Sequence, residues 1–381
     1  MLKQQKIFFD FLRFCIGPAK EIPGSLKEVD WKELYAIAKM QALLGVLFYG
    51  IRRLPKELVP KQKLLMQWMV MAEQIRKQNI RLFLDSVKVC LNFENEGFAN
   101  CILKGQGNAL LYPDPYMRTP GDIDIYLSGG RRKIIKYVDQ VCPNQVMRYH
   151  HVDFPVTKTA IEVHFTPSYM FCPIHNRRMQ KWFEEVMGEQ CNHRVSLPDG
   201  YGEIHVPHVS FNVIYILSHL YRHIFTEGIG LRQLLDYYFV LLKWHTDLTN
   251  LTDSNNSLPQ MTQINTDLDA LRHELKYLGL WKFAGAVMYV LHEVFGLSED
   301  RMIAPMNEKE GKFLLDEIMR GGNFGQYDDR MGDKVDESKI HRYFRMNLRN
   351  LRFVKHYPTE ALSEPLFRTW FAVWKKIHGI R

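Results

Sequence analysis

The sequence predicts an α+β protein in which a small mixed β-sheet lies between an N-terminal and a C-terminal helical region. Apolar residues recur at helical spacing in the first and last parts of the chain, whereas the middle alternates between strand-type and short helical segments. The chain has 381 residues, more than one hydrophobic core ordinarily spans. We therefore expect three regions, with bounds at 1–96, 97–206 and 207–381.

The N-terminal region is predicted to be helical. Apolar residues follow a helical period over 8–14, 31–49 and 63–93, and the last of these segments is the longest. Four prolines separate the segments: Pro18, Pro23, Pro55 and Pro60. Gly97 marks the end of the long helix, because a strand-type sequence follows it.

The middle region is predicted to hold the sheet. Strands are expected over 98–103, 122–127, 146–155 and 159–165, and helices over 106–112 and 131–141. A unit of this length is typical of a small domain. The residue patterns that indicate chemistry all lie within it.

The C-terminal region is predicted to be helical again. Apolar stripes follow a helical period over 211–224, 231–244, 268–278 and 281–295. The polar segment 253–259 is typical of a loop. No stretch of the chain approaches the roughly 18 uninterrupted apolar residues of a membrane span, and the first apolar segment lacks the features of an export signal. We therefore expect a cytoplasmic protein without a membrane span.

The composition excludes the disordered and fibrous classes, since 46% hydrophobic and 24% charged residues are ordinary for a globular protein. The formal net charge of +8 favours polyanionic ligands, which include nucleotides and nucleic acids. A compact motif of basic and aromatic residues, typical of nucleic-acid-binding surfaces, is absent from the sequence, which argues against a nucleic-acid partner. Nothing in the sequence indicates the oligomeric state.

Two acids, Asp122 and Asp124, alternate with apolar residues in a segment predicted to be a strand. Alternate residues of a strand point to the same face of the sheet, so the two carboxylates converge on one spot. Like charges that converge need a neutralising cation, and oxygen ligands suit Mg²⁺ or Mn²⁺. The pair therefore predicts a divalent-cation site.

A glycine-containing turn over 104–107 precedes this strand, and its backbone N–H groups at Gly105 and Gly107 are suited to hold phosphate. Lys104 and Arg118 are candidate cations for a triphosphate, Arg118 as a bidentate donor and Lys104 as a point charge. A cation site beside a phosphate site indicates nucleotide chemistry.

These patterns together resemble the bacterial uncharacterised nucleotidyltransferase family, within the superfamily that includes DNA polymerase β. The residues that carry the resemblance are Leu103-Lys104-Gly105, Tyr112-Pro113-Asp114-Pro115, Arg118, Gly121-Asp122-Ile123-Asp124 and Glu162-Val163-His164. Further along the chain, five residues fall in an order that the family also shows: His219, His223, Gly228, Leu231 and Asp236. The resemblance is strongest over 102–165.

The resemblance implies a nucleotidyltransferase core that moves a nucleoside monophosphate from a nucleoside triphosphate to a hydroxyl or phosphate acceptor and releases pyrophosphate. It implies that Asp122, Asp124 and Glu162 are both the catalytic acids and the ligands of Mg²⁺ or Mn²⁺. The residues expected to bind the triphosphate are Lys104, Gly105, Gly107 and Arg118. The family's associations point to polysaccharide or other secondary biosynthesis, with a small molecule or a polymer as acceptor.

Several alternatives remain open. The glycine turn contains no serine, which favours an alternative in which the turn does not bind phosphate. The chain would then be a noncatalytic nucleotide-binding sensor, or a partner-binding protein that retains the metal site. Lys104 could only extend to solvent, and Arg118 could only pair with Asp114. Three strand histidines near the acids, His150, His151 and His164, are more typical of hydrogen-bonded structural residues.

Overall fold

The computed structural model describes residues 3–17, 21–253, 268–331 and 338–378. The N-terminal region contains α1 (Lys3–Ile16), α2 (Trp31–Met40), α3 (Leu44–Ile51) and the long α4 (Gln62–Asn95), which confirms the helix expected over 63–93. The single helix expected over 31–49 is instead α2 and α3. Ala42 takes a φ of 56°, a left-handed conformation that a continuous helix excludes.

The middle region forms a sheet of four strands: β1 (Asn100–Ile102), β2 (Ile123–Leu127), β3 (His151–Asp153) and β4 (Ile161–His164). Their order is β1-β2-β4-β3, with β2 parallel to β4 and the outer pairs antiparallel, so the sheet is mixed as predicted. The strand expected over 146–155 is much shorter, because Met147 makes only an isolated bridge to Val152.

Helices and a second sheet complete this region. The crossover helix α6 (Arg131–Val141) is the one predicted, whereas α5 (Gln106–Ala109) is a single turn. The helix α7 (Pro173–Gln190) lies where the sequence predicted no element, and β5 (Arg194–Ser196) pairs with β6 (Glu203–His205).

Short helical turns in the described residues are η1 (Gly24–Glu28), η2 (Lys56–Leu58), η3 (Pro115–Met117), η4 (Pro198–Gly200), η5 (Leu291–Phe295), η6 (Glu299–Arg301), η7 (Asn323–Gly325) and η8 (Asp329–Met331).

The two faces of the sheet are chemically different. Ile123, Ile125 and Val163 point to one face and pack against buried side chains of α4 and α6, such as Phe93 and Ile134. The intervening residues of β2 and β4 are polar and point to the other face. The alternation in the sequence therefore separates a hydrophobic core on one face of the strands from polar side chains on the other.

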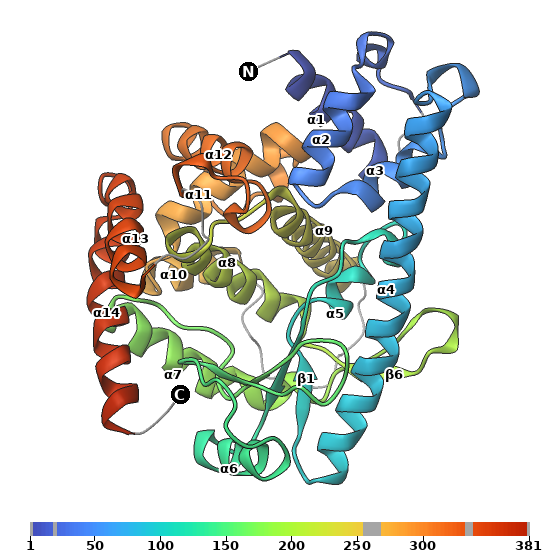
Figure 1. The fold of residues 1–381 in the computed structure, drawn as a ribbon. Helices are drawn as coiled ribbons and strands as arrows, with labels where there is room; N and C mark the ends of the chain where they lie inside the picture. Colours follow the sequence, from blue (N-terminus) through green and yellow to red (C-terminus); the bar gives the residue numbers. More distant parts are fainter. Residues whose placement is uncertain (1–2, 18–20, 254–267, 332–337, 379–381) are drawn as a thin grey trace.

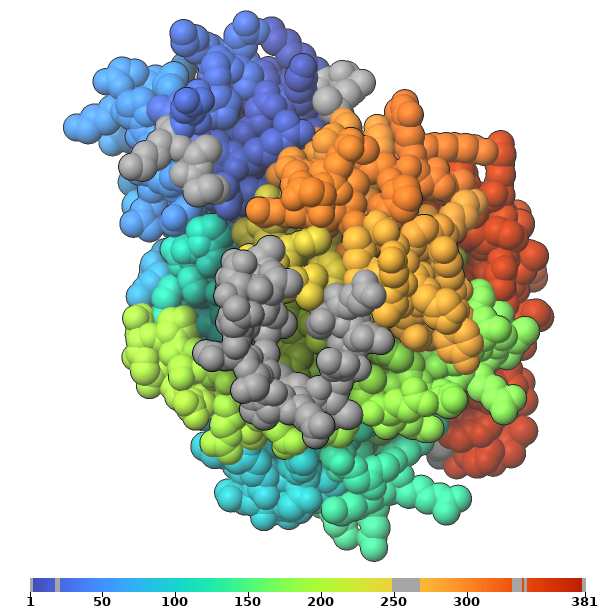
Figure 2. Space-filling view, turned by 180° about the vertical axis from the view of Figure 1, so that it is seen from behind, coloured from blue at the N-terminus to red at the C-terminus, as the bar shows by residue number. Residues whose placement is uncertain are grey.

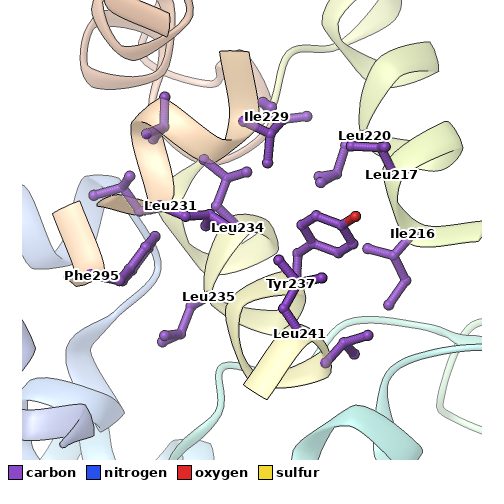
Figure 3. Packing of buried hydrophobic residues seen from close by; sticks show 14 of the residues in the cluster. Ile216, Leu217, Leu220, Ile229, Leu231, Leu234, Leu235, Tyr237, Leu241 and Phe295 are labelled. Carbon is purple, nitrogen blue, oxygen red and sulfur yellow. The ribbon is translucent and has the colours of Figure 1, made fainter. Parts of the chain in front are cut away.

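The C-terminal region consists of α8 (Val209–Thr226), α9 (Leu231–Asp253), α10 (Leu268–Tyr277), α11 (Trp281–Val290), α12 (Glu308–Gly321), α13 (Lys339–Val354) and α14 (Pro358–Ile377). Helices α8 and α9 pack together through buried side chains such as Leu217, Leu220, Leu234 and Tyr237 (Figure 3). The loop predicted over 253–259 lies outside the described residues apart from Asp253, which ends α9. No described helix is both long and apolar enough for a membrane crossing.

The two helical regions share one hydrophobic cluster. Phe8 and Phe11 of α1 belong to the same buried cluster as Leu291 and Phe295, and Arg13 donates to the carbonyl of Glu293. Seen from behind, residues near the N-terminus lie directly against those near residue 300 (Figure 2). The second half of α4, by contrast, packs in the cluster of the sheet. A division into domains at 96 and 206 stays a prediction.

Candidate active site

Strand pairing places the predicted acids side by side on the polar face. Asp124 of β2 is the direct neighbour of Glu162 in the parallel β4. On the other side of β4, Asp153 is opposite Glu162 and His151 is opposite His164. Because residues two apart in a strand share a face, these side chains all project from the same side of the sheet.

Asp124 is the buried centre of this group, with an exposed fraction of 3%. Its carboxylate lies 3.2 Å from Nζ of Lys104 and 2.9 Å from Nε2 of His164. Burial alone would raise the pKa of Asp124, but the Lys104 ammonium and the His164 hydrogen bond outweigh it and hold that pKa below its ordinary value. Asp124 therefore carries its charge in the folded protein.

Asp122 lies just before β2, and its negative charge is compensated less than that of Asp124. The negative charge of Asp124, followed by burial, raises the pKa of Asp122 to about 6. Lys104 lowers this pKa only in part, and Glu162 adds to the repulsion. The acidic cluster, which we define as Asp122, Asp124 and Glu162, thus contains more negative charge than its surroundings neutralise.

Three histidines surround the acids. Nδ1 of His151 is 3.1 Å from Oε2 of Glu162, and Nε2 of His164 is 3.6 Å from the same oxygen. The ring of His150 lies 4.5 Å from that of His151 and 5.0 Å from that of His164, centroid to centroid. Of the four groups of potential metal ligands found in the described residues, three are built from this face of the sheet.

The histidines differ in their protonation. Burial would lower the pKa of His164, but its hydrogen bonds to Asp124 and Glu162 raise it above the ordinary value. Burial, together with the positive charge of Arg222, holds the pKa of His150 well below its usual range. Burial and the neighbouring His164 lower the pKa of His151 to about 2. His151 and His150 are therefore neutral near pH 7, when each ring nitrogen without a proton is a ligand or proton acceptor.

Helix α8 brings a buried cation toward the same face. His219, Arg222 and His223 are each at most 9% exposed. Nζ of Lys104 is 2.9 Å from Nε2 of His219, and Nη2 of Arg222 is 3.0 Å from Nε2 of His223. No carboxylate among the described residues forms an ion pair with Arg222, whose guanidinium lies over the ring of Tyr169. A buried cation without a paired anion is a candidate site for an anionic ligand.

Arg118 forms an ion pair with Asp236 of α9 rather than with the acidic cluster. Its Nε and Nη2 donate to both carboxylate oxygens of Asp236 on α9, at 2.8 and 2.7 Å, and the hydroxyl of Tyr112 donates to the same carboxylate. The interpretation that Arg118 pairs with Asp114 is wrong, because the Asp114 carboxylate instead accepts from the backbone of Tyr116. All three members of the Arg118–Asp236–Tyr112 group are buried.

The glycine turn follows β1 as predicted. Gly105 has a φ of 67°, a conformation that favours glycine, and it precedes the single turn of α5. Gly107 has a packing reason of its own, since a Cβ there would lie 2.8 Å from a methyl carbon of Val206. The structure therefore explains both glycines by backbone conformation and packing, and phosphate binding by either stays a prediction.

Sequence reasoning missed Arg222 as a functional candidate and Asp236 as the partner of Arg118. Arg222 lies three residues after His219 and one before His223, so the three polar side chains lie on neighbouring positions of an otherwise apolar helix. That interruption of an apolar stripe is the signal that could have identified Arg222. The partner of Arg118 had no such signal, because Asp236 is more than one hundred residues away.

The residues of the acidic cluster fit a divalent cation. Carboxylate oxygens of Asp124 and Glu162 lie within 4.8 Å of each other, and His164, whose Nε2 is 2.9 Å from Asp124 and whose pKa is raised, lies beside them as a hydrogen-bond donor. The negative charge of Asp124 and burial raise the pKa of Asp122, and a bound cation would oppose both effects. Carboxylate oxygens suit both Mg²⁺ and Mn²⁺.

Comparison with known proteins gave one family. The family model described as an uncharacterised nucleotidyltransferase matches residues 27–296, which include the whole sheet, α8 and α9. Searches of curated proteins and of solved structures gave no match. The match extends over more than half of the chain and over every residue of the acidic cluster. The chain therefore belongs to the uncharacterised nucleotidyltransferase family.

Proposed function

We propose that the protein is a metal-dependent nucleotidyltransferase that transfers a nucleoside monophosphate from a nucleoside triphosphate to a hydroxyl or phosphate acceptor, with release of pyrophosphate. The observation that carries this proposal is the adjacency of Asp124 and Glu162 on parallel strands, beside an Asp122 whose charge is not neutralised. The acceptor belongs to polysaccharide or other secondary biosynthesis.

Asp122, Asp124 and Glu162 would hold Mg²⁺ or Mn²⁺. The bound cation neutralises charge on the triphosphate and on the attacking oxygen, which is the main requirement of phosphoryl chemistry. Lys104 and His164 supply part of the positive charge that keeps Asp124 ionised in the buried site. These two residues would therefore position the Asp124 carboxylate.

Glu162 is the candidate general base. Its side chain is 29% exposed, whereas that of Asp124 is 2% exposed, so Glu162 leaves more room for an acceptor than Asp124 does. Nδ1 of His151 and Nε2 of His164 lie 3.1 and 3.6 Å from its Oε2. A carboxylate in this position could accept the proton of a hydroxyl acceptor as the new bond to phosphorus forms.

The triphosphate would lie between the sheet and α8. Lys104 and Arg222 are the cations there, and they are linked through His219, whose ring nitrogens lie 2.9 and 3.5 Å from them. Gly105 and Gly107 would add backbone N–H groups from the adjacent turn. Arg118 would act indirectly, since its bonds to Asp236 fix the loop before β2 against α9.

Transfer can be tested with α-³²P-labelled nucleoside triphosphates, Mg²⁺ or Mn²⁺, and a cell extract as the source of acceptor. We expect a labelled product and pyrophosphate with the native chain, and neither with Asp124→Asn. The matched control is Asp316→Asn, which removes an exposed carboxylate on α12 and should retain full activity.

Two results would contradict the proposal. Full activity of Asp124→Asn would show that the acidic cluster is not catalytic. Metal-dependent binding of the triphosphate without transfer to any acceptor would instead support the noncatalytic sensor. That alternative predicts the same loss of binding on substitution of the cluster, so product formation is the measurement that separates the two.

A further inference from the structure

The last two helices present an apolar surface to solvent. On α13, Phe344, Leu348 and Leu351 are 60%, 69% and 61% exposed. On α14, the exposed large hydrophobic side chains are Leu362, Leu366, Trp370, Val373 and Ile377. These eight residues, which we call the hairpin stripe, are eight of the 20 exposed large hydrophobic residues of the described chain.

The stripe follows helical spacing. Residues three and four apart lie on one face of a helix, and the three residues of α13 and the five of α14 follow that spacing throughout. The opposite face of α14 packs inward, where Phe367 stacks on Tyr169 and contacts Tyr149. The two helices are therefore anchored on the body of the protein, while no residue that the structure describes covers one apolar face of each.

The same helices contain a large excess of basic over acidic residues. Between residues 339 and 377 there are nine Lys or Arg residues and two Glu residues, a difference of +7 in a chain with a net charge of +8. Both acids are buried and engaged: Glu360 accepts from the backbone of Phe171 and Cys172, and Glu364 accepts from Asn350. The exposed charges of the hairpin include Arg342, Lys355 and Lys376.

We propose that the hairpin stripe of α13 and α14 docks the protein on the surface of an anionic lipid bilayer. Exposed Leu, Ile, Phe and Trp side chains beside Lys and Arg, on a helix with an apolar face, are the features of helices that lie in the plane of a membrane interface. The apolar side chains enter the outer acyl region, while the cations contact lipid phosphates. Neither helix crosses the bilayer.

The positive charge of α13 and α14 favours an anionic bilayer over the other possible partners of the hairpin stripe. A second copy of the chain would bring two basic surfaces together, which is electrostatically unfavourable. A nucleic acid would satisfy the cations but would leave the aliphatic residues Leu348, Leu366 and Ile377 without a partner. An anionic bilayer matches both the charge and the apolar area.

The position of the hairpin is consistent with this role. It lies at the outer side of the molecule, opposite α4 (Figure 1), and it follows the residues that the family model matches. It is also connected to the candidate site, since the Tyr169 ring contacts both Phe367 and the Arg222 guanidinium. The inference concerns membrane attachment and holds whether or not the proposed transfer occurs.

Flotation with two kinds of vesicle tests the proposal. We expect the full-length chain to bind vesicles of phosphatidylcholine and phosphatidylglycerol in equal parts, and to bind pure phosphatidylcholine much less. Added salt should weaken the binding to anionic vesicles. The double variant Leu366→Glu with Ile377→Glu should bind at least about tenfold less, because two apolar contacts are lost and two negative charges are added.

The matched control is Leu84→Glu with Leu91→Glu on α4. These residues are 50% and 52% exposed, so the control makes the same chemical change at two exposed sites on the other side of the molecule. It should bind anionic vesicles like the native chain. Circular dichroism checks that both variants are folded, which is expected because all four side chains are exposed.

Three outcomes would overturn the proposal. The first is equal vesicle binding by the hairpin variant and the native chain. The second is no vesicle binding together with a dimer that the hairpin variant converts to a monomer, which would assign the stripe to a second copy. The third is no vesicle binding together with tight, salt-sensitive binding of single-stranded RNA that the hairpin variant abolishes.

Discussion

The Arg118–Asp236–Tyr112 group and the acidic cluster each contain a buried carboxylate, Asp236 and Asp124, but only the first group is balanced in charge. Asp236 receives two hydrogen bonds from Arg118 and one from Tyr112, so the carboxylate is neutralised and its hydrogen-bonding capacity is used. In the acidic cluster, three acids share Lys104 and a few imidazoles, and the pKa of Asp122 is raised to about 6.

The difference separates a structural ion pair from a binding site. Burial would raise the pKa of Asp236, but Arg118 outweighs it and lowers that pKa, so folding already provides the stabilising charge. At the acidic cluster, and again at Arg222, folding leaves charges that a ligand of opposite sign would stabilise. A buried charge therefore indicates a ligand only when its own surroundings do not neutralise it.

The largest effect is expected for Asp122→Asn on transfer. Loss of this carboxylate should reduce kcat by about 10³-fold, because one charge needed to hold the cation is gone. Asp122→Asn should also reduce Mn²⁺ binding measured by calorimetry, whereas Asp316→Asn should leave it unchanged. Unchanged Mn²⁺ affinity in Asp122→Asn would show that the excess charge at this point does not serve a cation.

Asp236→Asn should lower the stability of the protein and leave Mn²⁺ binding unchanged. It leaves the buried Arg118 guanidinium without its anion, so the free energy of unfolding should fall by about 3–5 kcal/mol in guanidinium titrations. Tyr112→Phe removes one hydrogen bond and should cost about 1 kcal/mol. The comparison fails if Asp236→Asn, at a temperature where it is folded, loses Mn²⁺ binding as Asp122→Asn does.

Arg222→Met should weaken binding of the nucleoside triphosphate by about 10- to 100-fold, equivalent to the roughly 1.5–3 kcal/mol of a hydrogen bond to a charged group. Arg222→Lys keeps the charge but loses the planar donor set, so it should restore affinity only in part. Calorimetric titration with the triphosphate and Mg²⁺ measures both. If Arg222→Met binds the triphosphate as tightly as the native chain does, Arg222 of α8 is not part of the triphosphate site.

The smallest effect is the pH dependence of stability in metal-free protein. The pKa of Asp122 is raised from an ordinary value near 4 to about 6, so the stability of the native chain falls as pH rises through that interval. Asp122→Asn lacks this loss and should melt at a higher temperature than the native chain at pH 8, with little difference at pH 4.

Asp236 should respond in the other direction. Its pKa is lowered, so its contribution is fully present above the unfolded value near 4 and is lost as pH falls below it. Thermal melts of the native chain and both variants between pH 3 and pH 8, in the presence of a chelator, measure the two slopes. Equal melting temperatures of Asp122→Asn and the native chain at pH 8 would contradict the charge excess.

Much of the fold was predictable because local patterns specify it. The helical period over 63–93 gave α4, and the alternation of acids with Ile123 and Ile125 gave β2 and its two faces. Element bounds were less accurate where one residue decides them. Ala42 splits a predicted helix through a left-handed φ, and its sequence context alone does not reveal that conformation.

Part of the candidate site was also predictable. The spacing of Asp122 and Asp124 required that both side chains share a face, and the apolar neighbours of Glu162 required that it point away from the core. Glu162 lies beside Asp124, however, only because β2 pairs with β4 rather than with β3. The strand order could not be predicted from the sequence.

The sequence by itself determined the secondary structure of the long elements, the polar face of β2 and the family resemblance, because each depends on residues close together in the chain. Only the tertiary structure decided that Arg118 binds Asp236. It also decided that, among the described residues, no acid pairs with the buried Arg222 and no side chain covers the apolar faces of α13 and α14. These features depend on which distant segments approach one another. The sequence of a charged residue or an apolar stripe is the same whether or not another part of the fold pairs with it or covers it, so the sequence alone does not distinguish the two cases.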